Sequence, residues 1–183
     1  AVQEHGFIAS DVAVFITGDR RGAPFLAGLL NSVGKLVIYD AARADRSGTR
    51  PSREVVERMV HRYHSSFGML VGSAWKLDKG VIQAIGFHGT ATPPAGIDKK
   101  LCRSVARACL VSEAVLQVAR EQPLTAIPPL AERCSGDEEL TSLLTVAGMA
   151  WSIFELGRSG GRTSKTTAKL VNKTDLSPSA ESD

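Results

Sequence analysis

The chain has 183 residues, of which 43% are hydrophobic and 22% charged, a composition typical of one globular domain. Its formal net charge of +3 is too small to indicate a nucleic-acid-binding protein, and the basic residues after position 157 have no aromatic side chains among them to stack on bases. The three cysteines form no CxxC pair, and the N-terminus lacks the pattern of a signal peptide. We therefore expect a cytoplasmic protein with free thiols and no cofactor.

Helical periodicity dominates the sequence, and no segment alternates between apolar and polar residues as a half-buried strand would. Pro24 suits a first helical turn, Ser52 and Asp78 suit helix N-caps, and Ser135 and Glu138 have capping-box spacing. These signals predict helices over about residues 3–17, 24–37, 52–63, 67–75, 81–87, 99–120 and from 135 onward.

The last predicted helix contains the apolar stretch at residues 140–156, which is the nearest approach to a membrane span. Thr, Ser and a terminal Glu interrupt this stretch, so we interpret it as a buried helix and expect no membrane contact. Gly, Ser, Thr and Lys prevail after it. The sequence thus predicts a folded domain over residues 1–157 and a flexible polar tail over 158–183.

Residues 29–37 read Leu-Leu-Asn-Ser-Val-Gly-Lys-Leu-Val. This stretch is similar to the Leu-Leu-His-Asp-Ile-Gly-Lys signature of the HD metal-phosphohydrolase superfamily, with Asn31 in place of the His and Ser32 in place of the Asp. An imidazole beside a carboxylate binds divalent cations, and a metal-bound water becomes a nucleophile near neutral pH. An amide beside a hydroxyl cannot hold such a site. The sequence therefore predicts that the catalytic metal centre has been lost.

A second block, between His64 and His88, contains a Phe-Gly pair, Trp-Lys-Leu-Asp and Val-Ile-Gln-Ala-Ile. Together with residues 29–37, this order resembles the HDOD domain, the HD-related output domain of bacterial signalling proteins, over roughly residues 4–110. The resemblance implies an all-α, HD-like helical bundle that acts in signal transduction without catalysis. Asp78 and Phe87 depart from the family's usual Pro and His, and the family's N-terminal half, with its Asp-Pro and Ala-Asn-Ser motifs, is absent.

The resemblance also implies a vestigial pocket that would bind a small signalling ligand or a protein partner. The candidate residues for this pocket are His5, Asn31, Ser32, Lys35, His64 and His88. The alternative is a degenerate metal-dependent phosphohydrolase that uses the residual histidines. The family's distant Asp should fall within residues 107–113, where this chain has Cys109 and Glu113 but no Asp.

Other residues near these motifs are expected to be structural. Gly34, Gly68 and Gly72 would permit close helix packing, and Phe67 and Trp75 would be core anchors. His61 would be exposed. Lys35 either attracts an anion or is a solvated side chain at a helix end.

Overall fold

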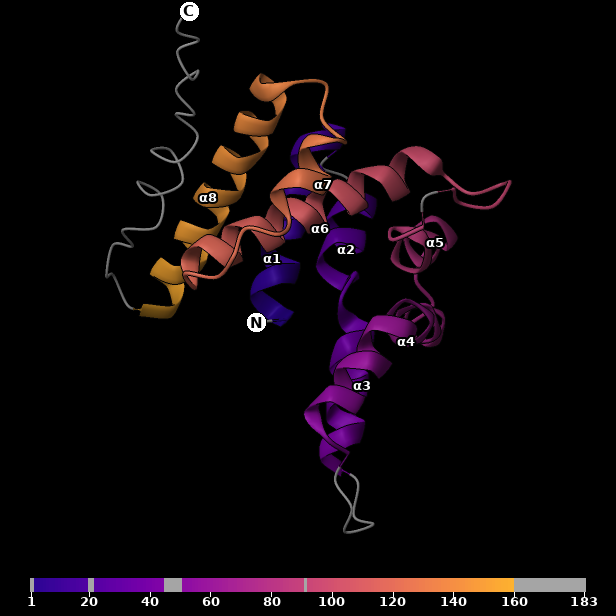
Figure 1. The fold of residues 1–183 in the computed structure, drawn as a ribbon. Coiled ribbons are helices and arrows are strands. Elements are labelled where there is room, and N and C mark those ends of the chain that lie inside the picture. The colour runs from indigo at the N-terminus through magenta and orange to yellow at the C-terminus, as the bar shows by residue number, and fades with distance from the viewer. Residues whose placement is uncertain (1, 20–21, 45–50, 91, 160–183) are drawn as a thin grey trace, which may run out of the picture.

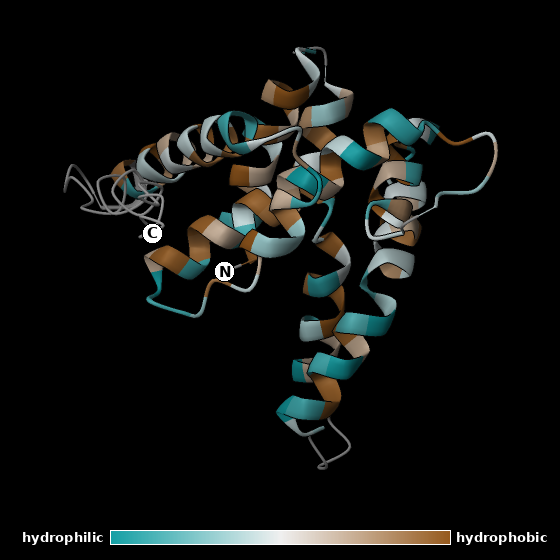
Figure 2. Cartoon of the chain, turned by 45° about the horizontal axis from the view of Figure 1, so that its top comes forward, coloured by the Kyte–Doolittle hydropathy of each residue, from teal (hydrophilic) through white to brown (hydrophobic). Residues whose placement is uncertain are grey.

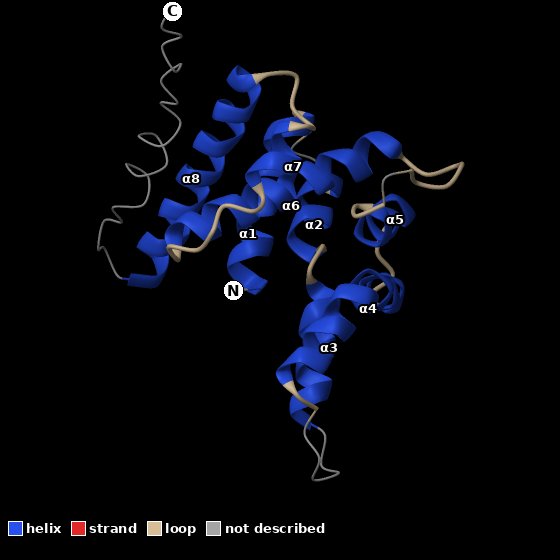
Figure 3. Cartoon of the chain, in the orientation of Figure 1, coloured by secondary structure: helices blue, strands red, loops and turns tan. Residues whose placement is uncertain are grey.

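The computed structural model describes residues 2–19, 22–44, 51–90 and 92–159, and within these ranges every regular element is a helix (Figure 3). This confirms the predicted all-α helical bundle. Figure 1 shows the helices in chain order: α1 Val2–Thr17, α2 Ala23–Leu30, α3 Val33–Ala44, α4 Arg53–Ala74, α5 Lys79–Phe87, α6 Lys99–Ala119, α7 Ile127–Ala131 and α8 Asp137–Ser159. The last helix includes the first two residues of the predicted tail, and residues 160–183 lie outside the described part.

Side-chain caps explain where several helices begin. The Ser52 hydroxyl accepts a hydrogen bond from the Val55 amide at 3.3 Å, and the Asp78 carboxylate accepts one from the Gly80 amide at 2.7 Å, which confirms both predicted caps. Asp98 caps α6 in the same way. At α8 the expected pairing of Ser135 with Glu138 is wrong, because the Ser135 amide donates to the carboxylate of Glu139 instead.

The largest part of the core lies between α1, α6, α7 and α8. α1 and α6 are buried along much of their length, because small and β-branched residues recur on their facing sides. α8 contributes one face, while Met149 and Ile153 on its other face are 50% and 62% exposed. The apolar stretch at residues 140–156 is therefore a core helix, as predicted, but only along one side.

A second cluster joins α2, α5 and the first half of α6, and a third, smaller cluster holds α3 against α4. α3 and α4 form an arm that projects from the rest of the molecule (Figure 1). Hydrophilic residues cover much of this arm (Figure 2). The arm's own core is thin and consists of Ile38, Val56 and Val60, with Phe67 packed beside it. The predicted role of Phe67 as a core anchor is thus confirmed.

The two helices of the arm approach each other at a pair of glycines. A Cβ on Gly34 would lie 1.9 Å from the carbonyl oxygen of His64 and 2.7 Å from the amide nitrogen of Gly68. Any side chain at position 34 would therefore collide with the backbone of α4. A Cβ on Gly72 would lie 3.1 Å from Ile82 on α5. These contacts confirm that the glycines serve close helix packing.

Three further sequence-based expectations differ from the structure. α4 runs unbroken where two helices, over 52–63 and 67–75, were expected, and the helix expected over 24–37 is interrupted by a turn at residues 31–32. Trp75 is 57% exposed and is not a core anchor. Trp75 follows Phe67 by eight residues, which rotates it by about 80° around an α-helix and away from the arm's core.

The stretch Ala23–Ala44 is long and apolar enough to cross a membrane by length and composition, and it is the one such stretch among the described residues. Within the most apolar 18 consecutive residues of this stretch, 33% of the residues are buried in the fold. Core helices of soluble proteins pass the same test, so this finding is weak evidence of a membrane span.

Candidate functional site

Asn31 and Ser32 occupy the turn between α2 and α3 and are 1% and 2% exposed. The Asn31 amide group donates a hydrogen bond to the carbonyl oxygen of Gly28. The Ser32 hydroxyl donates to the side-chain oxygen of Asn31 at 2.6 Å. These two buried side chains therefore satisfy each other and the preceding helix, as buried polar groups must. Their hydrogen bonds hold the turn between α2 and α3 together.

His64 and His88 come together from two helices. His64 lies in the middle of α4, and His88 is the C-cap residue of α5. Their ring centroids are 5.9 Å apart, with the rings inclined at 69°. In each residue Nδ1 lies close to a backbone oxygen, at 2.9 Å from Val60 and 2.8 Å from Ile85. A carbonyl can only accept, so both Nδ1 atoms carry the proton and both Nε2 atoms are acceptors.

His5 reaches the same region from α1. Its backbone carbonyl accepts a hydrogen bond from the Ser112 hydroxyl at 3.0 Å, which ties α1 to α6. Its Nδ1 atom is buried and has no hydrogen-bond partner among the described residues. A buried polar atom without a partner costs about 1–3 kcal/mol. A water molecule or a ligand that bonded to this nitrogen would recover that free energy.

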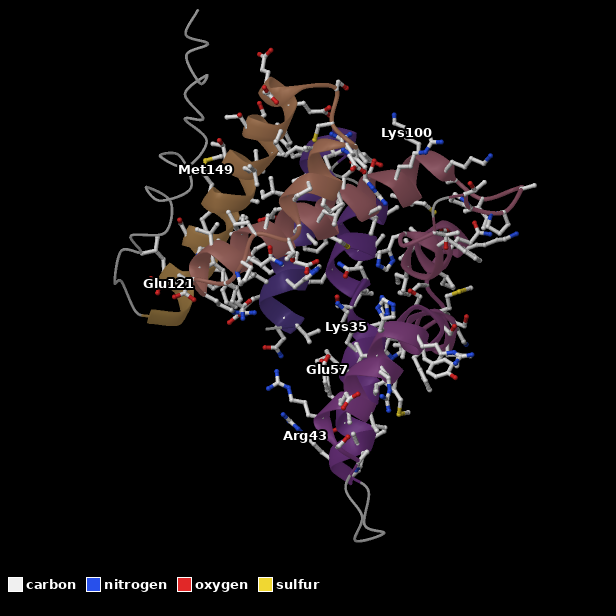
Figure 4. All side chains as sticks on the ribbon, in the orientation of Figure 1. Lys35, Arg43, Glu57, Lys100, Glu121 and Met149 are labelled. Atoms are coloured by element: carbon white, nitrogen blue, oxygen red, sulfur yellow. The ribbon has the colours of Figure 1, made fainter. Side chains whose placement is uncertain are left out.

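Lys35 contributes the positive charge of the site. It lies on α3, where the arm meets the rest of the molecule (Figure 4). Burial lowers the pKa of His5 to about 3 and of His88 to about 4, and it also lowers the pKa of His64. The positive charge of Lys35 contributes to the lowered pKa of all three histidines. The imidazoles are therefore neutral at pH 7.

Cys109 on α6 falls in the segment where the HD pattern has its distant Asp. Burial is the main reason why the pKa of its thiol is raised to about 12. The charge of Lys35 acts in the opposite direction, and the charge of Glu113 acts in the same direction as burial. The thiol is therefore protonated at neutral pH and offers no charge to a cation. Cys102 and Cys134 are likewise free thiols.

These groups do not fit a catalytic metal centre. In the described part of the chain, no three His, Cys, Asp or Glu side chains are arranged so that they could hold a metal ion. His64 and His88 form a pair without a third ligand, and the nearby charge is the ammonium of Lys35. The ammonium of Lys35 attracts an anion and repels a divalent cation, and the free nitrogens of the neutral imidazoles can accept hydrogen bonds from a ligand.

The structure thus brings together most of the residues that the sequence singled out. Four of them come from four different helices and interact electrostatically: His5, Lys35, His64 and His88. The turn formed by Asn31 and Ser32 lies about one helical turn before Lys35 in the chain. His61 is exposed on the outside of α4, as expected. The sequence left open whether Lys35 is solvated, and the structure shows it half-buried.

Comparison with protein families gives one match. Residues 2–91 match the family model of the HDOD domain. No curated protein and no solved structure matches the chain. The matched residues include α1 to α5 and all six candidate site residues. Residues 2–91 therefore belong to the HDOD domain family.

Proposed function

We propose that this protein is a non-catalytic regulatory module of bacterial signal transduction, located in the cytoplasm, that binds a small regulator or a protein partner. One observation carries the proposal. The position of the HD metal ligands holds a closed Asn31–Ser32 hydrogen bond, and the charge beside it is that of Lys35. Such a site can bind, but it has no means of activating a water molecule through a metal.

The groups that remain are suited to binding. The ammonium of Lys35 attracts an anionic group, the Nε2 atom of His88 accepts a hydrogen bond, and the Nδ1 atom of His5 has no partner. A small regulator with both a negative charge and a hydrogen-bonding group would use all three. This combination supports a ligand pocket in place of the ancestral active site.

The exposed surface of α4 supports the second possibility, a protein partner. Met59, Tyr63 and Leu70 are 41%, 41% and 65% exposed. Their spacing of four and seven residues places them on one narrow side of the helix. Exposed apolar groups that share one side of a helix are typical of contact surfaces.

The position of the site suggests how binding would be transmitted. Lys35 and His64 belong to the arm formed by α3 and α4, whereas His5 and His88 belong to the rest of the molecule. A ligand that bonds to groups on both sides would favour one orientation of the arm. Regulation would then follow from the ligand's different affinity for the two orientations.

A residual metal-dependent phosphohydrolase is the second candidate function. It is favoured by the tautomer of His64 and His88, because metal-binding histidines also donate one ring N–H to a carbonyl and bind through the other nitrogen. The replacement of the signature's His and Asp by Asn31 and Ser32, and the lack of a third ligand within the described residues, count against it.

Hydrolysis of bis(p-nitrophenyl) phosphate in the presence of Mn²⁺, Fe²⁺ or Zn²⁺ distinguishes the two functions. We expect the same background rate for the wild type and for His64→Ala. A metal-dependent rate that is lost in His64→Ala would contradict the proposal. His61→Ala provides the matched control, because His61 lies on the same helix but is exposed.

A further inference from the structure

A cleft of about 400 Å³ lies on the side of the molecule where the end of α5 and the following loop face α6 and the segment after α7. Three arginines line it, together with His88 and Thr90. Arg103 and Arg107 are four residues apart on α6 and so share one side of that helix, and Arg133 approaches from the segment after α7. Among the described residues that line the cleft, none carries a carboxylate.

The charges of these arginines are only partly compensated. Arg107 forms an ion pair with Glu139 on α8, whereas Arg103 and Arg133 form no ion pair with any described residue. Guanidinium groups that converge without counter-charges repel one another and create a positive potential in the cleft. Arginines at such a place are typical of sites that bind phosphate or carboxylate groups.

Arg107 provides a second and independent indication of a ligand. One of its terminal nitrogens donates to Glu139, but its Nε atom is buried and has no hydrogen-bond partner among the described residues. Guanidinium N–H groups are strong donors that are rarely left unpaired inside a protein. Arg107 lines the cleft and Glu139 holds one end of its guanidinium, so a small rotation of the side chain towards the cleft would let a bound anion accept a hydrogen bond from Nε.

We propose that this cleft binds a small molecule that carries a phosphate group. The tetrahedral oxygens of a phosphate can accept from several guanidinium groups at once, which a single carboxylate cannot do as well. The volume lies within the range of small-molecule sites, and Pro93, Cys102 and Ala106 add an apolar wall for the rest of the ligand. The cleft borders the candidate site through His88, but the inference does not depend on the proposed function.

Isothermal titration calorimetry with inorganic pyrophosphate, at physiological ionic strength, tests this proposal. We expect saturable binding to the wild type and weaker binding of malonate. Arg103→Gln combined with Arg133→Gln should weaken pyrophosphate binding by about tenfold or more for each guanidinium lost. Both arginines are exposed, so the double variant should fold.

The matched control is Arg43→Gln combined with Arg62→Gln, which removes the same charge from exposed positions on the arm. Its affinity for pyrophosphate should equal that of the wild type. Three results would overturn the proposal: no saturable binding to the wild type, an equal loss in both double variants, or malonate binding as tight as that of pyrophosphate. The last result would assign the cleft to carboxylates.

Discussion

Replacing Gly34 with Ala tests how the site is positioned, because Gly34 sets the distance between the two helices of the arm. The new Cβ would lie 1.9 Å from the carbonyl oxygen of His64. A carbon atom and a carbonyl oxygen normally approach no closer than about 3.3 Å, so the two backbones would have to separate by roughly 1.4 Å. Neither atom belongs to a flexible side chain, so the clash cannot be relieved locally.

The expected loss of stability follows from this geometry. Overpacking a well-packed contact costs about 1–3 kcal/mol, and a clash between two backbones should fall at or above the upper end. The better helix propensity of Ala returns at most about 1 kcal/mol. We therefore expect Gly34→Ala to lower the free energy of unfolding by at least about 2 kcal/mol. It should also move His64, whose carbonyl is the atom displaced.

Urea denaturation of Gly34→Ala and Gly89→Ala measures this difference. A Cβ on Gly89 would meet no atom within 4 Å, so that variant should unfold at nearly the same urea concentration as the wild type. If Gly34→Ala is as stable as the control, the close contact of α3 with α4 at Gly34 does not exist in solution, and the placement of Lys35 beside His64 loses its support.

Three further predictions concern stability and protonation. The pKa values of His5 and His88 are lowered from 6.5 to about 3 and about 4 in the folded protein. As the pH falls, these histidines are therefore protonated in the unfolded chain before they are protonated in the folded protein. Stability that is fully present above pH 6.5 should therefore be lost as the pH falls towards 4, at up to about 1.4 kcal/mol per pH unit for each histidine. NMR titration checks this, and signals assigned to the imidazoles of His5 and His88 that titrate near 6.5 would refute it. Arg120→Gln should lower the free energy of unfolding by about 1 kcal/mol, because it removes one charged partner of the buried Glu4. The exposed pair of Arg58 with Glu54 is the control, and Arg58→Gln should change stability by at most about 0.5 kcal/mol; equal effects in urea would contradict the difference in burial. Lys76→Gly should raise the melting temperature, because Lys76 has a φ of 56° in the C-terminal turn of α4, a conformation that costs a non-glycine residue about 1 kcal/mol; an unchanged or lower melting temperature would argue against that backbone conformation.

Much of the fold follows from local signals in the sequence. The caps at Ser52 and Asp78 and the close-packing glycines act over a few residues or on a neighbouring helix, so their residue types predict their roles. Trp75 shows the limit of this reasoning. Its large apolar side chain predicts burial, but its rotation around α4 relative to Phe67 leaves it exposed. Which side of a helix finds a partner depends on tertiary packing.

The candidate site shows the same division. The family motifs predict which residues gather, but the motif itself does not reveal that Asn31 and Ser32 bond to each other or that burial keeps the imidazoles neutral. The arginine cleft has no local signal at all. Its three arginines are spread over residues 103–133, and only the packing of α6 against the segment after α7 brings them together. A charge count shows them as ordinary surface residues.

The metal content of untagged protein tests the central claim most directly. The protein would be incubated with Mn²⁺, Fe²⁺ or Zn²⁺, desalted, and analysed by inductively coupled plasma mass spectrometry, with His64→Ala in parallel. Because a closed Asn31–Ser32 pair stands where the HD signature has its His and Asp, we expect far less than one ion per chain in both proteins. One tightly bound ion per chain in the wild type, lost in His64→Ala, would contradict this account.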